Sequence, residues 1–177
     1  MIEREVKIRV ADFSRLLPCL EAMGAIFAGS EEETNRMLDT AEGALTRRHH
    51  VLRVRSAAAS TITWKGAAAD HDPQGHKTRE ELEVEFAAEG TEELLSLLAR
   101  LGYAEVLRYA KRRDTWKWQG AEITLDRLEF GNFVEIEGEA SVIQDALHRL
   151  QLDQEPHEQR SYPELQRLLQ QQRERAT

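Results

Sequence analysis

The stretch Ile2-Glu3-Arg4-Glu5-Val6-Lys7-Ile8-Arg9-Val10 alternates with the two-residue period of a β-strand. One face of that strand carries the apolar side chains together with Arg4, and the other carries Glu3, Glu5, Lys7 and Arg9. This second face is charged at every position, whereas the solvent face of an ordinary strand mixes neutral and charged residues. The fold therefore has to provide a place for a strand face made only of acids and bases.

The same alternation returns in further segments of the chain. Charged or polar residues alternate with apolar ones in the ranges 52–55, 61–65, 77–86, 111–118, 123–126 and 134–137. In the third of these ranges the charged face consists of Lys77, Arg79, Glu81, Glu83 and Glu85. Carboxylates two residues apart on one face lie ~6–7 Å apart and repel each other unless a cation lies between them. A divalent ion would supply that cation.

Helical segments lie between the strands and have recognisable start and stop signals. Apolar residues recur with helical spacing over 13–23 after the cap Asp12, over 91–101, over 142–150 and over 165–169. Ser161 and Glu164 form a capping box before the last helix, and the tail after Gln170 is expected to fray. Hairpins are predicted at Gly120 and at 131–132, and a loop over 67–75.

The composition describes a globular domain and excludes several classes of protein. The 177 residues carry 24 Lys and Arg against 32 Asp and Glu, a net charge of −8 that argues against a broad nucleic-acid-binding surface. Cys19 is the single cysteine, which excludes a disulfide framework and a Cys-rich zinc module. The chain has neither a membrane-spanning apolar run nor the N-terminal pattern of a signal peptide. We expect one cytoplasmic domain over 1–177, with its core over about 2–169 and no membrane or nucleic-acid partner.

The arrangement that accommodates the charged strand faces is an α+β fold with a closed antiparallel β-barrel of about eight strands. The charged faces would line its lumen, and the apolar faces would point outward under covering helices. A lumen with equal numbers of acids and bases has to stay wet and hold a ligand that is itself multiply charged. Phosphate chains with Mg²⁺ or Mn²⁺ fit this requirement, because carboxylates bind such ions and guanidinium groups bind phosphate oxygens. The competing interpretation is a β-sandwich whose charged faces are merely solvated.

A series of motifs supports the barrel. Glu3-x-Glu5-x-Lys7 is followed by Asn35 to Thr40, Leu52-Arg53-Val54-Arg55, Thr63-Trp64-Lys65-Gly66, Lys77-Thr78-Arg79-Glu80-Glu81-x-Glu83-x-Glu85, Lys111-x-Arg113, Leu125-Asp126, Gly131-x-Phe133-x-Glu135-Ile136-Glu137 and Ser161-Tyr162-x-Glu164-Leu165. In this order they resemble the CYTH superfamily, the triphosphate tunnel metalloenzymes, which includes class IV adenylyl cyclases, thiamine triphosphatases and inorganic triphosphatases. Met37-Leu38-Asp39 departs from the family, in which aromatic residues usually precede the aspartate.

The resemblance implies an eight-stranded tunnel and a role for each matching residue. The implied ligands of Mg²⁺ or Mn²⁺ are Glu3, Glu5, Asp126, Glu135 and Glu137. The implied phosphate-binding bases are Lys7, Arg53, Arg55, Lys65, Arg79, Lys111 and Arg113. Glu81, Glu83 and Glu85 are further lumen acids, and Glu5, Lys7 and Lys65 are candidate catalytic residues, the two lysines through proton transfer.

The function favoured by these residues is metal-dependent hydrolysis of an inorganic, nucleoside or thiamine triphosphate. A class IV adenylyl cyclase, which converts ATP to cyclic AMP and pyrophosphate, is the alternative enzyme. A non-catalytic polyphosphate-binding module is a further alternative, although it would need the bases without the paired acids. Homodimerisation stays open, and His49-His50 are interpreted as a solvated turn outside the site.

Overall fold

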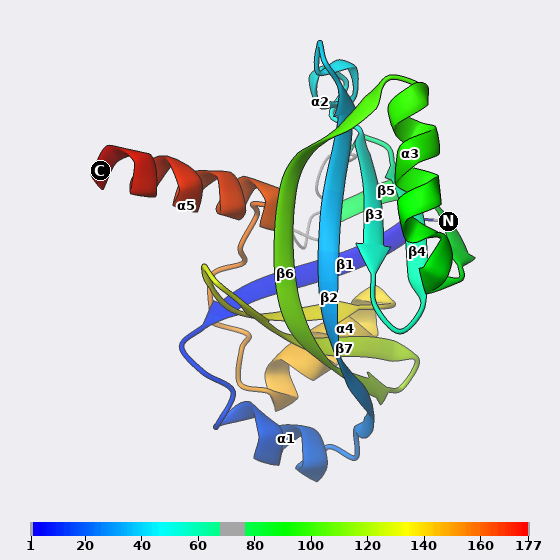
Figure 1. The fold of residues 1–177 in the computed structure, drawn as a ribbon. Coiled ribbons are helices and arrows are strands. Elements are labelled where there is room, and N and C mark those ends of the chain that lie inside the picture. Colours follow the sequence, from blue (N-terminus) through cyan, green and yellow to red (C-terminus); the bar gives the residue numbers. More distant parts are fainter. Residues whose placement is uncertain (1, 68–76, 177) are drawn as a thin grey trace.

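The computed structural model describes residues 2–67 and 77–176, arranged as a barrel with helices around it (Figure 1). Most of the loop predicted over 67–75 lies outside these residues. The strands are β1 (Ile2–Val10), β2 (Ile26–Thr40), β3 (Val51–Ser56), β4 (Ser60–Lys65), β5 (Lys77–Phe86), β6 (Tyr103–Trp118), β7 (Ala121–Leu128) and β8 (Gly131–Glu137). The helices are α1 (Leu16–Ala22), α2 (Ala44–Arg47), the short 3₁₀-helix η1 (Ala88–Gly90), α3 (Thr91–Arg100), α4 (Ala140–Arg149) and α5 (Tyr162–Ala176). No helix of the described residues is long and apolar enough to span a membrane.

All eight strands belong to one antiparallel sheet, in which hydrogen-bonded neighbours follow the order β1-β5-β4-β3-β2-β6-β7-β8. Because β1 pairs with both β5 and β8, the order returns to its start and the sheet closes into a barrel. The predicted eight-stranded antiparallel sheet with helices is confirmed. The hairpins joining β6, β7 and β8 turn at Gly120 and Gly131, which have φ angles of +82° and +142° that favour glycine.

Strands β2 and β6 are much longer than the sequence pattern indicated. β2 has 15 residues and pairs along most of its length with the 16-residue β6. The acids Glu31, Glu32 and Glu33 are consecutive, so they interrupt the period of two by which the other strands were found. This pair forms one wall of the barrel and brings Glu33 opposite Lys111.

The outer apolar face of β1, β6, β7 and β8 is covered as predicted. Leu16 and Leu20 of α1 and Ile143 and Leu147 of α4 join a buried cluster with the strands, and Trp116 lies in the same cluster. On the other side, α3 packs Leu94, Leu95 and Leu98 against β2, β3 and β4. These two clusters pack against the barrel wall from outside. A third cluster includes Met37, Tyr109 and Tyr162, which face the interior together with the charged residues.

Two expectations about the outer surface are wrong. Leu82 and Val84 on the outer face of β5 are 59% and 63% exposed, so the helices do not cover every apolar face. The C-terminal segment does not fray after Gln170, because α5 continues to Ala176. The start of α5 does match the predicted capping box, since the backbone N–H and hydroxyl of Ser161 both donate to Glu164, at 2.6 and 2.7 Å.

Candidate functional site

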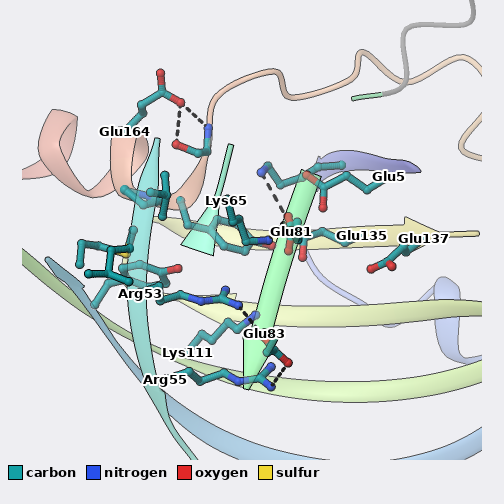
Figure 2. A pocket seen from close by; sticks show the side chains of 18 of the residues that line it. Glu5, Arg53, Arg55, Lys65, Glu81, Glu83, Lys111, Glu135, Glu137 and Glu164 are labelled. Atoms are coloured by element: carbon teal, nitrogen blue, oxygen red, sulfur yellow. Dashed lines mark hydrogen bonds and ion pairs between the residues drawn. The ribbon is translucent and has the colours of Figure 1, made fainter. Parts of the chain in front are cut away.

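A cavity of about 820 Å³ lies inside the barrel (Figure 2). Its lining includes most of the charged residues that the sequence placed in the lumen, namely Glu5, Lys7, Arg53, Arg55, Lys65, Glu81, Glu83, Lys111, Arg113, Glu135 and Glu137. They come from strands that are far apart in the sequence and adjacent in the barrel. The strand alternation therefore produces a charged interior, and the sandwich with solvated charged faces is ruled out.

Asp126 is the centre of a buried network on the β6–β7–β8 wall. Its carboxylate is fully buried and accepts two hydrogen bonds from Arg113, at 2.7 and 2.5 Å, and one from Lys111 at 3.2 Å. The hydroxyl of Tyr162, at the start of α5, donates a further bond of 2.8 Å. Because both of its oxygens are engaged, Asp126 fixes the position of these bases and of the helix.

Glu135 holds the other side of the same network. It accepts a 2.6 Å hydrogen bond from Arg113 and lies 3.5 Å from the Nζ of Lys7. Burial opposes its ionisation, but the charges of Lys7 and Arg113 outweigh burial and hold the pKa of Glu135 well below its usual range. The opposite balance applies to Lys111, whose pKa is lowered by burial and by the nearby Arg113. The neighbouring bases therefore keep Glu135 ionised, whereas burial and Arg113 disfavour the charged form of Lys111.

Glu33 was missed by the sequence analysis, and it is a buried acid that contacts three of the bases lining the cavity. It is 1% exposed and lies 3.5 Å from Lys111 and 3.8 Å from both Arg113 and Arg55. Burial raises its pKa, but the three bases outweigh burial and lower it overall. The signal that could have identified it is the motif beginning at Asn35, because continuing that strand backwards by two residues places Glu33 on the same face.

Tyr162 and Tyr109 are further residues whose place in the cavity the sequence did not reveal. The Nζ of Lys7 lies 4.5 Å from the centre of the Tyr162 ring, and the Nζ of Lys111 lies 5.4 Å from it. The two tyrosine rings pack edge to face, and burial raises the pKa of Tyr109 to about 12. Both phenols therefore stay neutral, so they can donate hydrogen bonds without adding negative charge.

The two arginines on β3 are held more loosely than the bases on β6. Arg53 and Arg55 extend from β3 toward Glu83 of β5, at 3.6 and 3.7 Å (Figure 2), and Lys65 of β4 forms an ion pair with Glu81. The buried Nε atoms of Arg53 and Arg55 have no hydrogen-bond acceptor among the described residues. Donors without an acceptor inside a charged cavity are suited to an anionic ligand.

Acids gather at the other end of the cavity, where Glu5 and Glu137 are opposite each other on the paired strands β1 and β8. Glu122 of β7 is also opposite Glu137. Partial burial, followed by the charges of Glu5 and Glu122, raises the pKa of Glu137. Carboxylates that repel one another in this way fit a hard divalent cation such as Mg²⁺ or Mn²⁺. However, among the described residues no group of three or more His, Cys, Asp and Glu is arranged to hold a metal ion.

Known proteins share this combination of sheet and motifs. Residues 1–162 match the CYTH domain family. The chain belongs to the CYTH family. Within curated proteins, it is 28% identical over 147 residues to a Methanocaldococcus jannaschii protein named as a candidate adenylate cyclase, a match that covers 82% of this chain and 81% of that protein.

Solved structures show the same fold. The PH1012 protein of Pyrococcus horikoshii OT3 is 31% identical, with a TM-score of 0.72 over 92% of this CYTH chain and 98% of that chain. HpAC1 from Hippeastrum is 20% identical, with a TM-score of 0.75 over 94% of this chain and 95% of its own. That protein is described as a candidate adenylyl cyclase with a dominant triphosphatase activity.

Some of the residues that the resemblance assigned to the CYTH site have other contacts. As arranged here, Asp126 and Glu135 bind bases, so a role of either in holding metal stays a prediction. The side chains of Glu3 and Arg79 lie outside the described residues, although their backbones are opposite each other on β1 and β5. The cavity lining does not include Glu85.

Arg9 is the remaining lumen residue of the β1 motif, and it points elsewhere. Its guanidinium donates a 2.8 Å hydrogen bond to the carbonyl of Phe130 and lies over the ring of Phe133. Arg9 lies at the end of β1 beyond the cavity. The alternating charge pattern continues past the cavity, so it wrongly predicted Arg9 as a lumen residue.

His49 and His50 lie at the turn predicted before β3, and His49 is exposed. Both also line the cavity. The turn that carries them is held by Asp39, whose carboxylate accepts hydrogen bonds from the backbone N–H of Leu45 and Thr46, at 2.9 Å each. Burial works against its ionisation, but these bonds and that from the Thr46 hydroxyl lower the pKa of Asp39 to about 2. Asp39 thus fixes the turn at the cavity entrance.

Proposed function

We propose that this CYTH chain is a divalent-metal-dependent enzyme that hydrolyses inorganic or organic triphosphates inside its barrel. The observation that carries the proposal is the convergence of six bases in one cavity with a cluster of mutually repelling carboxylates at its end. The bases are Lys7, Arg53, Arg55, Lys65, Lys111 and Arg113. A triphosphate complexed with a metal ion carries both signs of charge and would satisfy both groups.

The bases would bind and orient the phosphate chain. Phosphoryl transfer is catalysed mainly by positioning and by neutralising charge on the transferred group's oxygens. Arg113 and Lys111 are fixed by Asp126, which makes them suited to hold phosphate oxygens in one position. Arg53 and Arg55 have unsatisfied donors and would add contacts as the chain enters. Water attack on the terminal phosphorus would then release orthophosphate.

Glu5 and Glu137 would hold the metal ion. Their carboxylates suit that role because burial and the charges of Glu5 and Glu122 raise the pKa of Glu137, although Lys65 opposes them. A bound Mg²⁺ or Mn²⁺ supplies neutralisation of phosphate charge and activation of water. Glu5, Lys7 and Lys65 are the catalytic candidates, since all three line the cavity.

Adenylyl cyclase activity is the second candidate. It is favoured by the name of the Methanocaldococcus jannaschii relative and by a cavity large enough for more than a phosphate chain. The ribose 3′ hydroxyl would then attack the α-phosphorus, and pyrophosphate would leave. The two reactions would use the same bases, but they differ in the position of the substrate along the cavity and in the nucleophile.

Product analysis tests the proposal. The purified protein is incubated with Mg²⁺ or Mn²⁺ and separately with inorganic triphosphate, ATP and thiamine triphosphate, and orthophosphate, pyrophosphate and cyclic AMP are resolved. We expect orthophosphate release that falls at least about 100-fold in Glu5→Gln, since one metal ligand is lost. Glu80→Gln, an exposed change of the same kind on β5, is the matched control and should keep full activity.

Each product identifies one function. Cyclic AMP with equal pyrophosphate would establish the cyclase in place of the hydrolase. Triphosphate binding without any product, in the presence of either metal, would leave a non-catalytic binding module.

A further inference from the structure

Glu83 occupies an unusual position between two arginines of the cavity. Its carboxylate oxygens lie 3.6 Å from a terminal nitrogen of Arg53 and 3.7 Å from one of Arg55. The hydroxyl of Thr63 donates a 2.6 Å hydrogen bond to the same carboxylate, and Arg53 donates to that hydroxyl at 3.2 Å. Figure 2 shows both guanidinium groups directed at this one acid. Two cations and a hydroxyl donor therefore surround a single anion.

The contacts of Glu83 differ from those of the other acids that pair with cavity bases. Asp126 and Glu33 are fully buried at their side chains, whereas the Glu83 side chain is 43% exposed. Arg113 makes hydrogen bonds of 2.5–2.7 Å to Asp126, but the arginine nitrogens nearest Glu83 are beyond hydrogen-bond distance. The ion pairs of Glu83 are consequently loose and open to exchange.

The arginines also keep unused binding capacity. The Nε atoms of Arg53 and Arg55 lack an acceptor among the residues that the structure describes, so Glu83 does not satisfy either guanidinium. A phosphate group has three or more acceptor oxygens and more charge than one carboxylate. It would engage both guanidinium groups and the Thr63 hydroxyl more completely than Glu83 does.

We propose that Glu83 is an internal competitor for the phosphate group that Arg53, Arg55 and Thr63 would bind: its carboxylate holds these residues in the ligand-free protein, and the ligand displaces it. The inference rests on the proposed function, because it assigns one part of the triphosphate cavity. Since Glu83 reclaims the arginines whenever the ligand leaves, it weakens anion binding and assists product release. In this role Glu83 sets the affinity of the site for phosphate groups and is not a catalytic residue.

A merely structural role for Glu83 makes the opposite prediction. If its function were to neutralise the arginines and keep the wall together, removing its charge would loosen the arginines and weaken phosphate binding. An internal competitor, in contrast, weakens binding while it is present, so its removal strengthens binding. The sign of the change in affinity therefore separates the two roles.

The test is isothermal titration of inorganic triphosphate and of pyrophosphate into metal-free protein, in which turnover does not interfere. Glu83→Gln keeps the shape of the side chain and its acceptor for Thr63, and Glu83→Ala removes the charge in a second way. We expect both variants to lower the Kd of triphosphate by about tenfold, the scale for removing one nearby like charge. Glu80→Gln, on the exposed outer face of the same strand, should leave the Kd unchanged.

The outcomes separate this inference from the proposed function. An unchanged or higher Kd in both Glu83 variants, with triphosphate binding and hydrolysis by the unaltered protein, would overturn the inference alone. Failure of the unaltered protein to bind triphosphate, with or without metal, would overturn the inference and the proposed function together.

Discussion

Glu135 and Glu137 lie two residues apart on β8 and face the same cavity, yet their surroundings shift their pKa values in opposite directions. Glu135 belongs to the half of the cavity where Lys7, Arg113 and Asp126 satisfy one another. Glu137 belongs to the half where carboxylates from neighbouring strands repel. The first half is completed by the protein itself, whereas the proposed function requires a cation from outside to balance the second. A single strand thus contributes one acid whose charge is balanced by neighbouring bases, Glu135, and one whose charge is opposed by burial and by neighbouring acids, Glu137.

Asp126 is the acid at the centre of the half that the protein completes itself, so removing its charge should have the largest effect. Asp126→Asn leaves Lys111 and Arg113 without their buried counter-charge, and we expect the free energy of unfolding to fall by about 3–5 kcal/mol. Urea unfolding followed by circular dichroism measures this change. Asp145→Asn is the matched control, because Asp145 forms an exposed helix pair with Arg149 and should matter by less than about 0.5 kcal/mol. Equal losses in the two variants would show that the network does not stabilise the wall.

Tyr162→Phe tests how much the hydrogen bond from α5 to Asp126 contributes to stability. The variant loses the hydroxyl that donates to Asp126 and keeps the ring beneath Lys7, so we expect a loss of about 1–2 kcal/mol in the free energy of unfolding. Tyr103→Phe, in a cluster on the outer side of the barrel, is the control and should lose less. A change of less than about 0.3 kcal/mol would mean that the helix is held by its apolar contacts alone.

The sequence was enough to predict many of the charged residues that face the cavity, but not which of their charges are balanced by a neighbour. Strand alternation was enough to place Lys111, Glu135 and Glu137 on one face, because side chains alternate strictly along a strand. It could not identify Glu33, since its strand contains three consecutive acids. It also could not show that Asp126 and Glu135 hold bases, because which acid pairs with which base depends on the register of the closed sheet.

The same limit explains why the sequence did not place His49 and His50 at the cavity. His49 and His50 follow a four-residue helix that has no periodic signal, and the turn is fixed by Asp39, a long-range capping arrangement. In the C-terminal segment, Arg173 forms an exposed ion pair with Glu129, a contact with the β7–β8 hairpin that no local pattern in α5 indicates. Local patterns identified the elements, and tertiary contacts decided their ends and their roles.

Glu137→Gln is expected to give the smallest change in stability. Unlike the two variants above, it should stabilise the protein. Removing an acid from a group of like charges should raise the free energy of unfolding of the metal-free protein at neutral pH by about 0.2–1 kcal/mol. A raised pKa means that the folded protein binds this proton more tightly than the unfolded chain, so ionisation destabilises the fold as the pH rises through the folded pKa. The gain should therefore disappear toward acid pH, below the ordinary pKa of a glutamate.

Thermal unfolding between pH 4 and 8, with and without Mn²⁺, measures both parts of this expectation. Added metal should raise the Tm of the unaltered protein, because the ion binds the folded state, and should raise that of Glu137→Gln much less. Glu139→Gln, whose side chain is 87% exposed just beyond β8, should respond to pH and to metal as the unaltered protein does. A metal-free variant less stable than its parent at neutral pH would mean that the carboxylates at this end stabilise each other through shared contacts. The cavity would then be complete without a cation, and the contrast between Glu135 and Glu137 would lose its functional meaning.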